Sequence, residues 1–174
     1  MSRDGVNRAA KTVIRVSPTL DTSAYADNDV FFNATEIPSA VCEKGGCSKL
    51  IGITILNEDD VAHDHDLIFM QVSSDLGTIN SAVASNSKWT NALAKSAKVL
   101  GVMTIDWSDM SVDMVNNLIT SIGGGSYVEN GQKVFPMLLQ AEAGSRSVYF
   151  AGVSRGGTPT TAVDDYEYIF HIEY

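Results

Sequence analysis

The sequence predicts an all-β protein with an antiparallel β-sandwich fold. Apolar residues recur with the period of two, or in the short runs, that are typical of strands in eight segments. The turns between them are rich in Gly, Asn, Asp and Ser, as in sandwiches and barrels. Helical patterns do not alternate regularly with the strands, which argues against a parallel α/β sheet. Among sandwiches we expect a jelly-roll-like fold with one or two short packing helices.

The clearest strand runs from Tyr166 to the last residue, Tyr174. Aromatic and branched side chains take every second position there, and mostly polar residues stand between them. Several other candidates are apolar at consecutive positions, as expected for strands buried in a sandwich core. Pro136 interrupts one of them and predicts an edge strand or a bulge. In chain order these candidates are Thr12–Val16, Val30–Asn33, Leu50–Leu56, Leu67–Val72, Val99–Ile105, Val134–Gln140 and Val148–Val153.

Two segments have the apolar spacing of short helices that pack on a sheet. The first is Ser87–Lys98, in which Trp89, Ala92, Leu93 and Ala97 share one face. The second is Ser108–Ile122, with Ser108 as its cap and glycines at its end. Its apolar face consists of Met110, Met114, Val115, Leu118 and Ile122.

Charge divides the chain into a short basic arm and an acidic body. The net charge of the 174 residues is -9, yet residues 1–15 hold four basic side chains and one acidic side chain, a balance of +3. The remainder is therefore at -12, which opposes nucleic-acid binding. No apolar run is long enough to span a membrane, and the N-terminus lacks the apolar core of a secretory signal. We expect an arm at 1–11 and a single sandwich domain at 12–174.

NEDDVAHDHD, residues 57–66, concentrates five carboxylates and a His-x-His pair between two strands. We favour a solvated acidic connection, either a hairpin or a crossing between sheets, because Asp and Asn bond local backbone groups. On an extended chain His63 and His65 point the same way, and with Asp59 or Asp60 they resemble a transition-metal site. Metal enzymes with this fold normally add an imidazole or carboxylate from a distant strand, and the only other histidine of the chain is His171. A calcium loop is disfavoured because the stretch has no glycine at the bend.

CEKGGC, residues 42–47, holds both cysteines of the chain. The two glycines allow a tight turn that brings Cys42 and Cys47 within disulfide reach, although free thiols are expected where the protein is made. A zinc site that combines these cysteines with His63 and His65 is the sharper alternative, but the H-x-H spacing is too short for a standard finger.

GVSRG, residues 152–156, matches the G-x-S-x-G pattern of serine hydrolases. Asp164 or Asp165 and then His171 follow Ser154 in nucleophile-acid-histidine order. That chemistry needs a sharp turn into a helix, and GGTPTTAVDDY does not form one. We therefore expect no catalytic residue, no metal and no cofactor. We expect Trp89 and Trp107 to pack in the core or anchor an interface, with a sugar-stacking platform as the alternative.

Three stretches of the chain together resemble a known group of proteins. They are VIRVSPTLDTSAYADNDVFFNATEIPSAV, GGCSKLIGITILNEDD and FPMLLQAEAGSRSVYFAGVSRGG, and the similarity extends from about residue 12 to residue 174, more weakly at about 82–132. They resemble small virion-associated structural proteins of marine tailed bacteriophages. The resemblance implies a phage structural protein in the virion, assembled in the host cytoplasm, and carries over no catalytic residues.

We therefore expect a non-enzymatic virion protein, a capsid decoration or cement protein that stabilises the head shell. Its partners would be the major capsid protein or other virion proteins, and it would act as a homo-oligomer without binding nucleic acid or membrane. Two alternatives remain: a tail or fibre component that binds host surface glycan, and a cupin-like metal-dependent enzyme that uses His63, His65 and His171. The candidate partner-binding residues are Arg3, Arg8 and Lys11.

Overall fold

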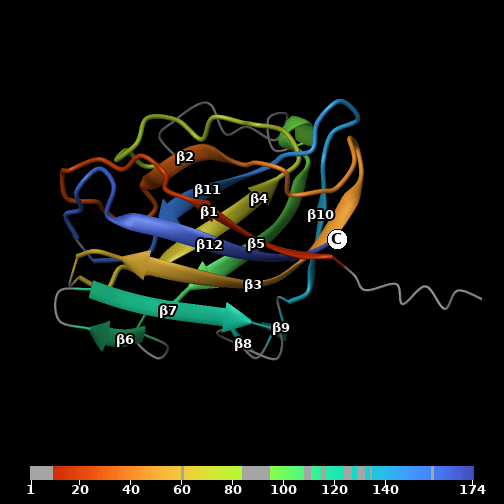
Figure 1. Ribbon diagram of the computed structural model, residues 1–174. Helices are drawn as coiled ribbons and strands as arrows, with labels where there is room; N and C mark the ends of the chain where they lie inside the picture. Colours follow the sequence, from red (N-terminus) through yellow and green to blue (C-terminus); the bar gives the residue numbers. More distant parts are fainter. Residues whose placement is uncertain are drawn as a thin grey trace, which may run out of the picture.

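Two antiparallel sheets that pack face to face make up the fold (Figure 1). The computed structural model describes residues 10–59, 61–83, 95–107, 111–114, 117–123, 127–128, 132–133, 135–157 and 159–174. The larger sheet has the order β1-β12-β3-β7-β6, and β10 pairs with one end of β3. Its strands are β1 (Lys11–Val16), β12 (Tyr166–Glu173), β3 (Cys47–Asn57), β7 (Asn117–Gly123), β6 (Ser111–Met114) and β10 (Met137–Gln140).

The smaller sheet has the order β2-β11-β4-β5. Its strands are β2 (Val30–Ile37), β11 (Val148–Ser154), β4 (His65–Met70) and β5 (Val99–Ile105). A separate short pair is formed by β8 (Tyr127–Val128) and β9 (Gln132–Lys133). In the described part of the chain, no helix has the length and hydropathy that a membrane crossing requires.

The strand order is that of a jelly roll. If the additional strands β6, β8, β9 and β10 are set aside, the larger sheet reads β1-β12-β3-β7 and the smaller one reads β2-β11-β4-β5. From β1 to β4 the chain thus alternates between the two sheets. Near its end, β11 inserts between β2 and β4, and β12 inserts between β1 and β3. Two interlocked Greek keys of this kind define the fold. The predicted fold class, an antiparallel jelly-roll-like sandwich, is confirmed.

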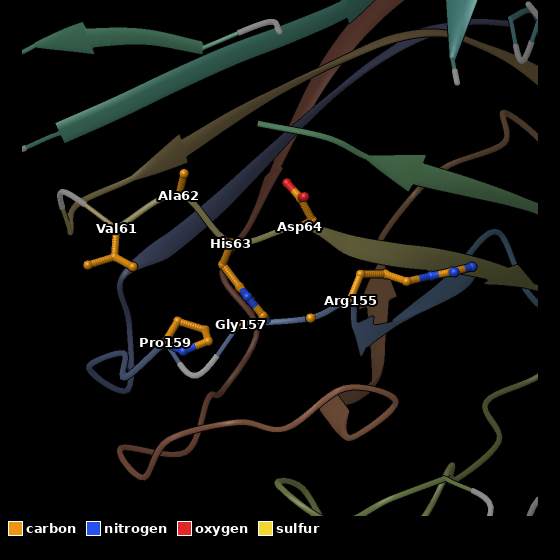
Figure 2. Close-up of a pocket in the computed structure, with 8 residues that line it drawn as sticks. Val61, Ala62, His63, Asp64, Arg155, Gly157 and Pro159 are labelled. Carbon is orange, nitrogen blue, oxygen red and sulfur yellow. The ribbon is translucent and has the colours of Figure 1, made fainter. Parts of the chain in front are cut away.

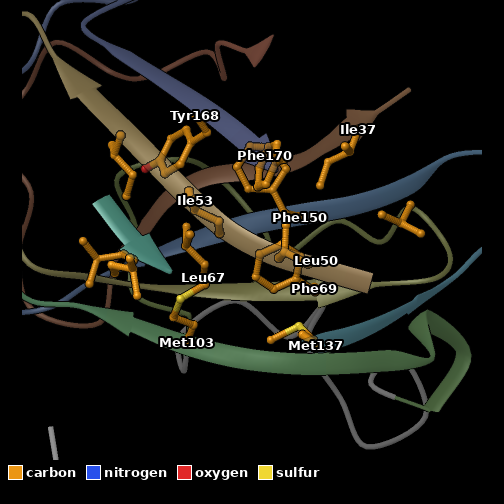
Figure 3. Close-up of a cluster of buried hydrophobic side chains, with 14 of the residues drawn as sticks. Ile37, Leu50, Ile53, Leu67, Phe69, Met103, Met137, Phe150, Tyr168 and Phe170 are labelled. Atoms are coloured by element: carbon orange, nitrogen blue, oxygen red, sulfur yellow. The ribbon is translucent and has the colours of Figure 1, made fainter. Parts of the chain in front are cut away.

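The space between the sheets is filled largely by aromatic side chains (Figure 3). Phe150 of β11 lies edge-on against Phe170 of β12, with 4.9 Å between ring centroids. Gly152 is required beside them, because a Cβ at this position would lie 2.4 Å from Cε1 of Phe32. This packing connects strands from both sheets and explains why the alternation in 166–174 is so regular. The buried aromatic residues of this core are Tyr25, Phe31, Phe32, Phe69, Trp107, Phe135, Phe150, Tyr166, Tyr168 and Phe170.

The helix predicted at Ser108–Ile122 is wrong. Residues 111–114 and 117–123 are strands β6 and β7, which pair as a hairpin with Met114 opposite Asn117. The i, i+4 spacing of the apolar residues fits a helix, but Thr120 and Ile122 are β-branched and buried, and β7 pairs with β3 along six positions. Tertiary pairing and β-branching outweigh the helical period here.

The other predicted helix, Ser87–Lys98, lies largely outside the described residues. Of it, residues 95–97 form a helical turn, and Ala97 is fully buried against the outer face of the smaller sheet. The strand predictions are confirmed with shifted ends: β2 continues to Ile37, and β10 begins after Pro136. Among the described strands β10 pairs with β3 alone, as predicted for an edge strand.

Candidate functional site

The acidic stretch 57–66 crosses from one sheet to the other. It leaves β3 of the larger sheet at Asn57 and enters β4 of the smaller sheet at His65, so it is a crossing and not a hairpin. The two histidine rings lie side by side, 6.1 Å apart and at 29° to each other, which confirms that they point the same way. However, His63 and His65 are only 2% and 0% exposed. The prediction of a solvated connection holds for Glu58 but is wrong for both histidines.

His65 is held at both ring nitrogens. Nδ1 lies 2.7 Å from the carbonyl oxygen of His63, which only accepts hydrogen bonds, so Nδ1 carries the proton. Nε2 therefore accepts a hydrogen bond of 2.8 Å from the hydroxyl of Tyr168 on β12. Burial lowers the pKa of His65 to about 3, and burial raises the pKa of Tyr168 well above its usual value. Both groups are consequently neutral at pH 7.

His63 is a packing residue whose ring lies among aromatic side chains. The ring centroid is 4.8 Å from that of Phe31, edge-on, and 6.1 Å from that of Tyr25, stacked. Burial lowers the pKa of His63 to about 4, so the imidazole is neutral at physiological pH. Its Nε2 is buried and has no hydrogen-bond partner in the described part of the chain.

A pocket of about 410 Å³ lies over His63, between the crossing segment and the turn that follows β11. Figure 2 shows the His63 ring directed toward Gly157 and Pro159, whereas the carboxylate of Asp64 points to the other side. Oδ1 of Asp64 accepts a hydrogen bond of 2.8 Å from the backbone N–H of Trp107. The lining residues are Val61, Ala62, His63, Asp64, Arg155, Gly156, Gly157 and Pro159.

Asp66 and Arg155 form the principal charged contact beside this pocket. Nε and Nη2 of Arg155 lie 2.6 and 2.5 Å from Oδ2 of Asp66, and the hydroxyl of Thr104 donates to Oδ1 at 2.6 Å. The carboxylate is thus occupied by neighbours from β5 and from the turn that follows β11. No sequence pattern marks Arg155 as its partner, because the two residues are 89 positions apart.

The described residues of the metal hypotheses do not lie together, and Asp60, one of the two candidate carboxylates, lies outside the described residues. His171 alternates with the buried Phe170 and Ile172, so its side chain lies on the outer face of β12, and Nε2 is 3.2 Å from Oγ1 of Thr54. His65 lies on the core side of the sandwich. Cys42 and Cys47 are exposed free thiols, and Cys47 begins β3 at the end opposite Asn57, where the segment that carries the histidines begins. Among the described residues, no three His, Cys, Asp or Glu side chains are grouped to hold an ion.

Residues of the segment that matches G-x-S-x-G, 152–156, contribute to packing inside the sandwich. Ser154 is the last residue of β11, fully buried, and the chain continues into the turn that carries Arg155 and Gly156. His171 lies on the opposite side of the larger sheet, so a Ser–Asp–His arrangement is not formed by these residues. Trp107 is also buried and packs edge-on against Tyr166 at 6.1 Å, which confirms core packing for this tryptophan. Trp89 lies outside the described residues.

Of the predicted partner-binding residues, Lys11 is the first residue of β1, whereas Arg3 and Arg8 lie outside the described residues. The Lys11 side chain is 64% exposed, and its Nζ is 3.7 Å from Oε2 of Glu173. Arg15 lies four residues further along β1, and its Nη1 is 2.6 Å from Oε2 of Glu167. Both cations therefore stand on the outer face of the larger sheet, at its β1 edge. No protein-family model and no curated protein sequence matches the chain. The function is therefore inferred from the surface and core features described above.

Proposed function

We propose that this chain is a non-enzymatic structural protein of a tailed bacteriophage virion, a decoration or cement protein that stabilises the head shell. Three features support the proposal. The three stretches quoted in the sequence analysis led us to expect a virion-associated protein, the fold is a jelly roll of the kind used in viral capsids and lectins, and a basic segment precedes an acidic body. A fold can host many functions, so the proposal depends on the residues that the surface presents.

The observation that carries the proposal is the division between core and surface. Three residues that the sequence offers as metal ligands or as a nucleophile lie inside the sandwich, where they serve as packing and hydrogen-bonding groups. They are His63, His65 and Ser154. The outer face of the larger sheet instead presents exposed cations and Val13, which is 54% exposed, along a regular strand. Such a surface suits contact with another protein.

A decoration protein acts by bridging neighbouring shell subunits. Burial of apolar surface contributes about 25 cal/mol per Å², and a stable interface covers on the order of 1,200–2,000 Å². Contacts that are weak singly become strong when many symmetric copies bind together. We therefore expect a homo-oligomer or a lattice of copies that joins major capsid protein subunits.

The test is a reconstitution with emptied heads of the encoding phage that lack this protein. The purified chain is added, the heads are sedimented, and their rupture temperature is measured with and without the chain. We expect saturable binding and a higher rupture temperature. Binding that leaves the rupture temperature unchanged would contradict the cement role, and a chain that stays in the supernatant would contradict decoration of the head.

A further inference from the structure

The free edge of β1 has a defined set of unpaired backbone groups. β1 pairs with β12 without register shifts, and the N–H of Tyr174 donates to the carbonyl of Ala10. Hydrogen-bonded pairs alternate along an antiparallel ladder, so Thr12, Ile14 and Val16 also bond to β12. Their neighbours on β1 therefore direct three N–H donors and three carbonyl acceptors away from the sheet. These neighbours are Lys11, Val13 and Arg15.

This edge is open, in contrast to the equivalent edge of β2 in the smaller sheet. Along β2, the N–H of Val30 donates to Ser81 and its carbonyl accepts from Asn80, while the Asn33 side chain bonds Leu76 and Gly77. The segment 76–83 thus covers the part of β2 from Val30 to Asn33. Within the described residues, no backbone hydrogen bond reaches the outward groups of β1.

The side chains around the β1 edge are also incompletely covered. Ile14 and Val16 point toward the core but are only half-buried, as expected where a neighbouring strand is missing. On the outer face Val13 lies between the two cations and borders a hollow of about 360 Å³. The hollow is lined by Lys11, Thr12, Val13, Ile51, His171 and Ile172.

Charge decides between a second copy and a different partner. An antiparallel pair of β1 strands centred on Val13 would put Lys11 of one copy opposite Arg15 of the other, and like charges in this position repel. An incoming strand with acidic residues at these two positions would instead complement both. The present ion pairs with Glu173 and Glu167 are exposed and contribute roughly 0–1 kcal/mol each, so they do not prevent an exchange of partners.

We propose that the β1 edge binds an extended segment of another virion protein by strand addition. The segment has the pattern acidic–apolar–apolar–apolar–acidic, with the acidic residues at Lys11 and Arg15 and an apolar residue beside Val13. The two apolar residues between them face inward and cover Ile14 and its neighbours. The identity of the partner as a virion protein rests on the proposed function, whereas the strand addition follows from the edge itself.

The experiment measures binding of a fluorescein-labelled peptide with the core Glu-Val-Val-Val-Glu to the full chain, against the matched peptide Lys-Val-Val-Val-Lys. We expect the acidic peptide to bind at least about tenfold more tightly, and less tightly as salt is added. Val13→Pro removes one outward N–H without touching the ladder to β12, because proline is tolerated at an edge. It is expected to weaken binding at least about tenfold, and Val13→Thr is expected to retain it.

Two further comparisons make the result decisive. Lys11→Gln is expected to weaken binding severalfold, and Lys44→Gln, which removes an exposed charge elsewhere, is expected to leave it unchanged. Equal binding of the two peptides, or equal binding by Val13→Pro and Val13→Thr, would overturn the proposal. Self-association of the wild type that Val13→Pro abolishes would assign the edge to a second copy instead.

Amide hydrogen exchange covers the case in which Val13→Pro does not fold. In the wild type, the acidic peptide is expected to protect the amides of Lys11, Val13 and Arg15, and no gain in protection would exclude strand addition. The peptide assay contains no capsid. If the peptide does not bind but the chain still binds capsids, only the proposed edge site is refuted. If the peptide binds but the chain does not bind capsids, only the proposed function is refuted.

Discussion

The hydroxyl of Tyr168 donates a 2.8 Å hydrogen bond to Nε2 of His65, and both residues are fully buried although they are 103 positions apart. This bond joins β12 of the larger sheet to β4 of the smaller one. The chain therefore places a polar connection inside an aromatic core, where an unmatched partner is costly.

Tyr168→Phe is expected to lower the free energy of unfolding by about 1–3 kcal/mol, because it leaves Nε2 of His65 buried without a donor. Urea denaturation measures the change. Tyr174→Phe is the matched control: its hydroxyl donates to the carbonyl of Ser39 at an exposed site, and its loss should cost well under half as much. Equal effects of the two substitutions would show that the buried hydrogen bond stabilises the fold no more than the exposed one.

The two histidines are expected to respond differently to replacement by leucine at pH 7. His65→Leu leaves the Tyr168 hydroxyl and the His63 carbonyl without their partner and should cost about 2–4 kcal/mol. His63→Leu removes a buried nitrogen that has no partner in the described structure, so it should change stability by less than about 1 kcal/mol. The reverse order, measured by urea denaturation, would mean that His63 holds a bound group.

The free energy of unfolding is expected to decrease as the pH falls below 6.5. The pKa values of His63 and His65 are lowered to about 4 and about 3 in the fold, so the unfolded chain binds protons that the folded chain does not. Their stabilising contribution is complete above pH 6.5 and is lost as the pH falls toward 4, by an amount on the order of a few kcal/mol.

Melting temperatures measured from pH 7.5 to pH 4.5 test this dependence. The wild type should melt at progressively lower temperature below pH 6.5, and His63→Leu should show a shallower decline because one of the two groups is absent. A wild-type curve that is flat between pH 7 and pH 5 would refute the burial of the two neutral rings.

Gly152 tests the interpretation of the G-x-S-x-G stretch as packing. Gly152→Ala places a methyl group 2.4 Å from the Phe32 ring and should cost more than about 2 kcal/mol. Gly144→Ala, whose added methyl group meets nothing within 4 Å, should change stability by less than about 0.5 kcal/mol. Gly101→Ala meets the flexible end of Met137 and is expected to fall between them. Similar melting temperatures for all three variants would contradict the packing at β11.

Much of the fold is predictable because strand periodicity reports directly on which face is buried. The alternation from Tyr166 to Tyr174 and the apolar run of β5 at Val99–Ile105 both appear as predicted. The segment 108–122 is mispredicted because its apolar spacing fits both periods, and pairing of β7 with β3 decides the outcome. Whether 57–66 turns back or crosses depends on the sheet that β4 joins, which no local pattern encodes.

The candidate site is less predictable than the fold. The common direction of His63 and His65 follows from their spacing, but their burial does not, because the surrounding carboxylates suggest a solvated loop. Their environment comes from Tyr168 and Phe31, which are distant in sequence. The open edge of β1 depends likewise on which strands lack a neighbour, and that is a property of the completed sheet.

The proposed virion role is tested most directly by quantitative mass spectrometry of purified virions of the phage that is proposed to encode the chain. If the chain decorates the head, it is present at on the order of hundreds of copies per particle, in a fixed ratio to the major capsid protein that the shell symmetry sets. About a dozen copies would place it in the neck, baseplate or fibre, and its absence from purified particles would contradict a structural role in the virion.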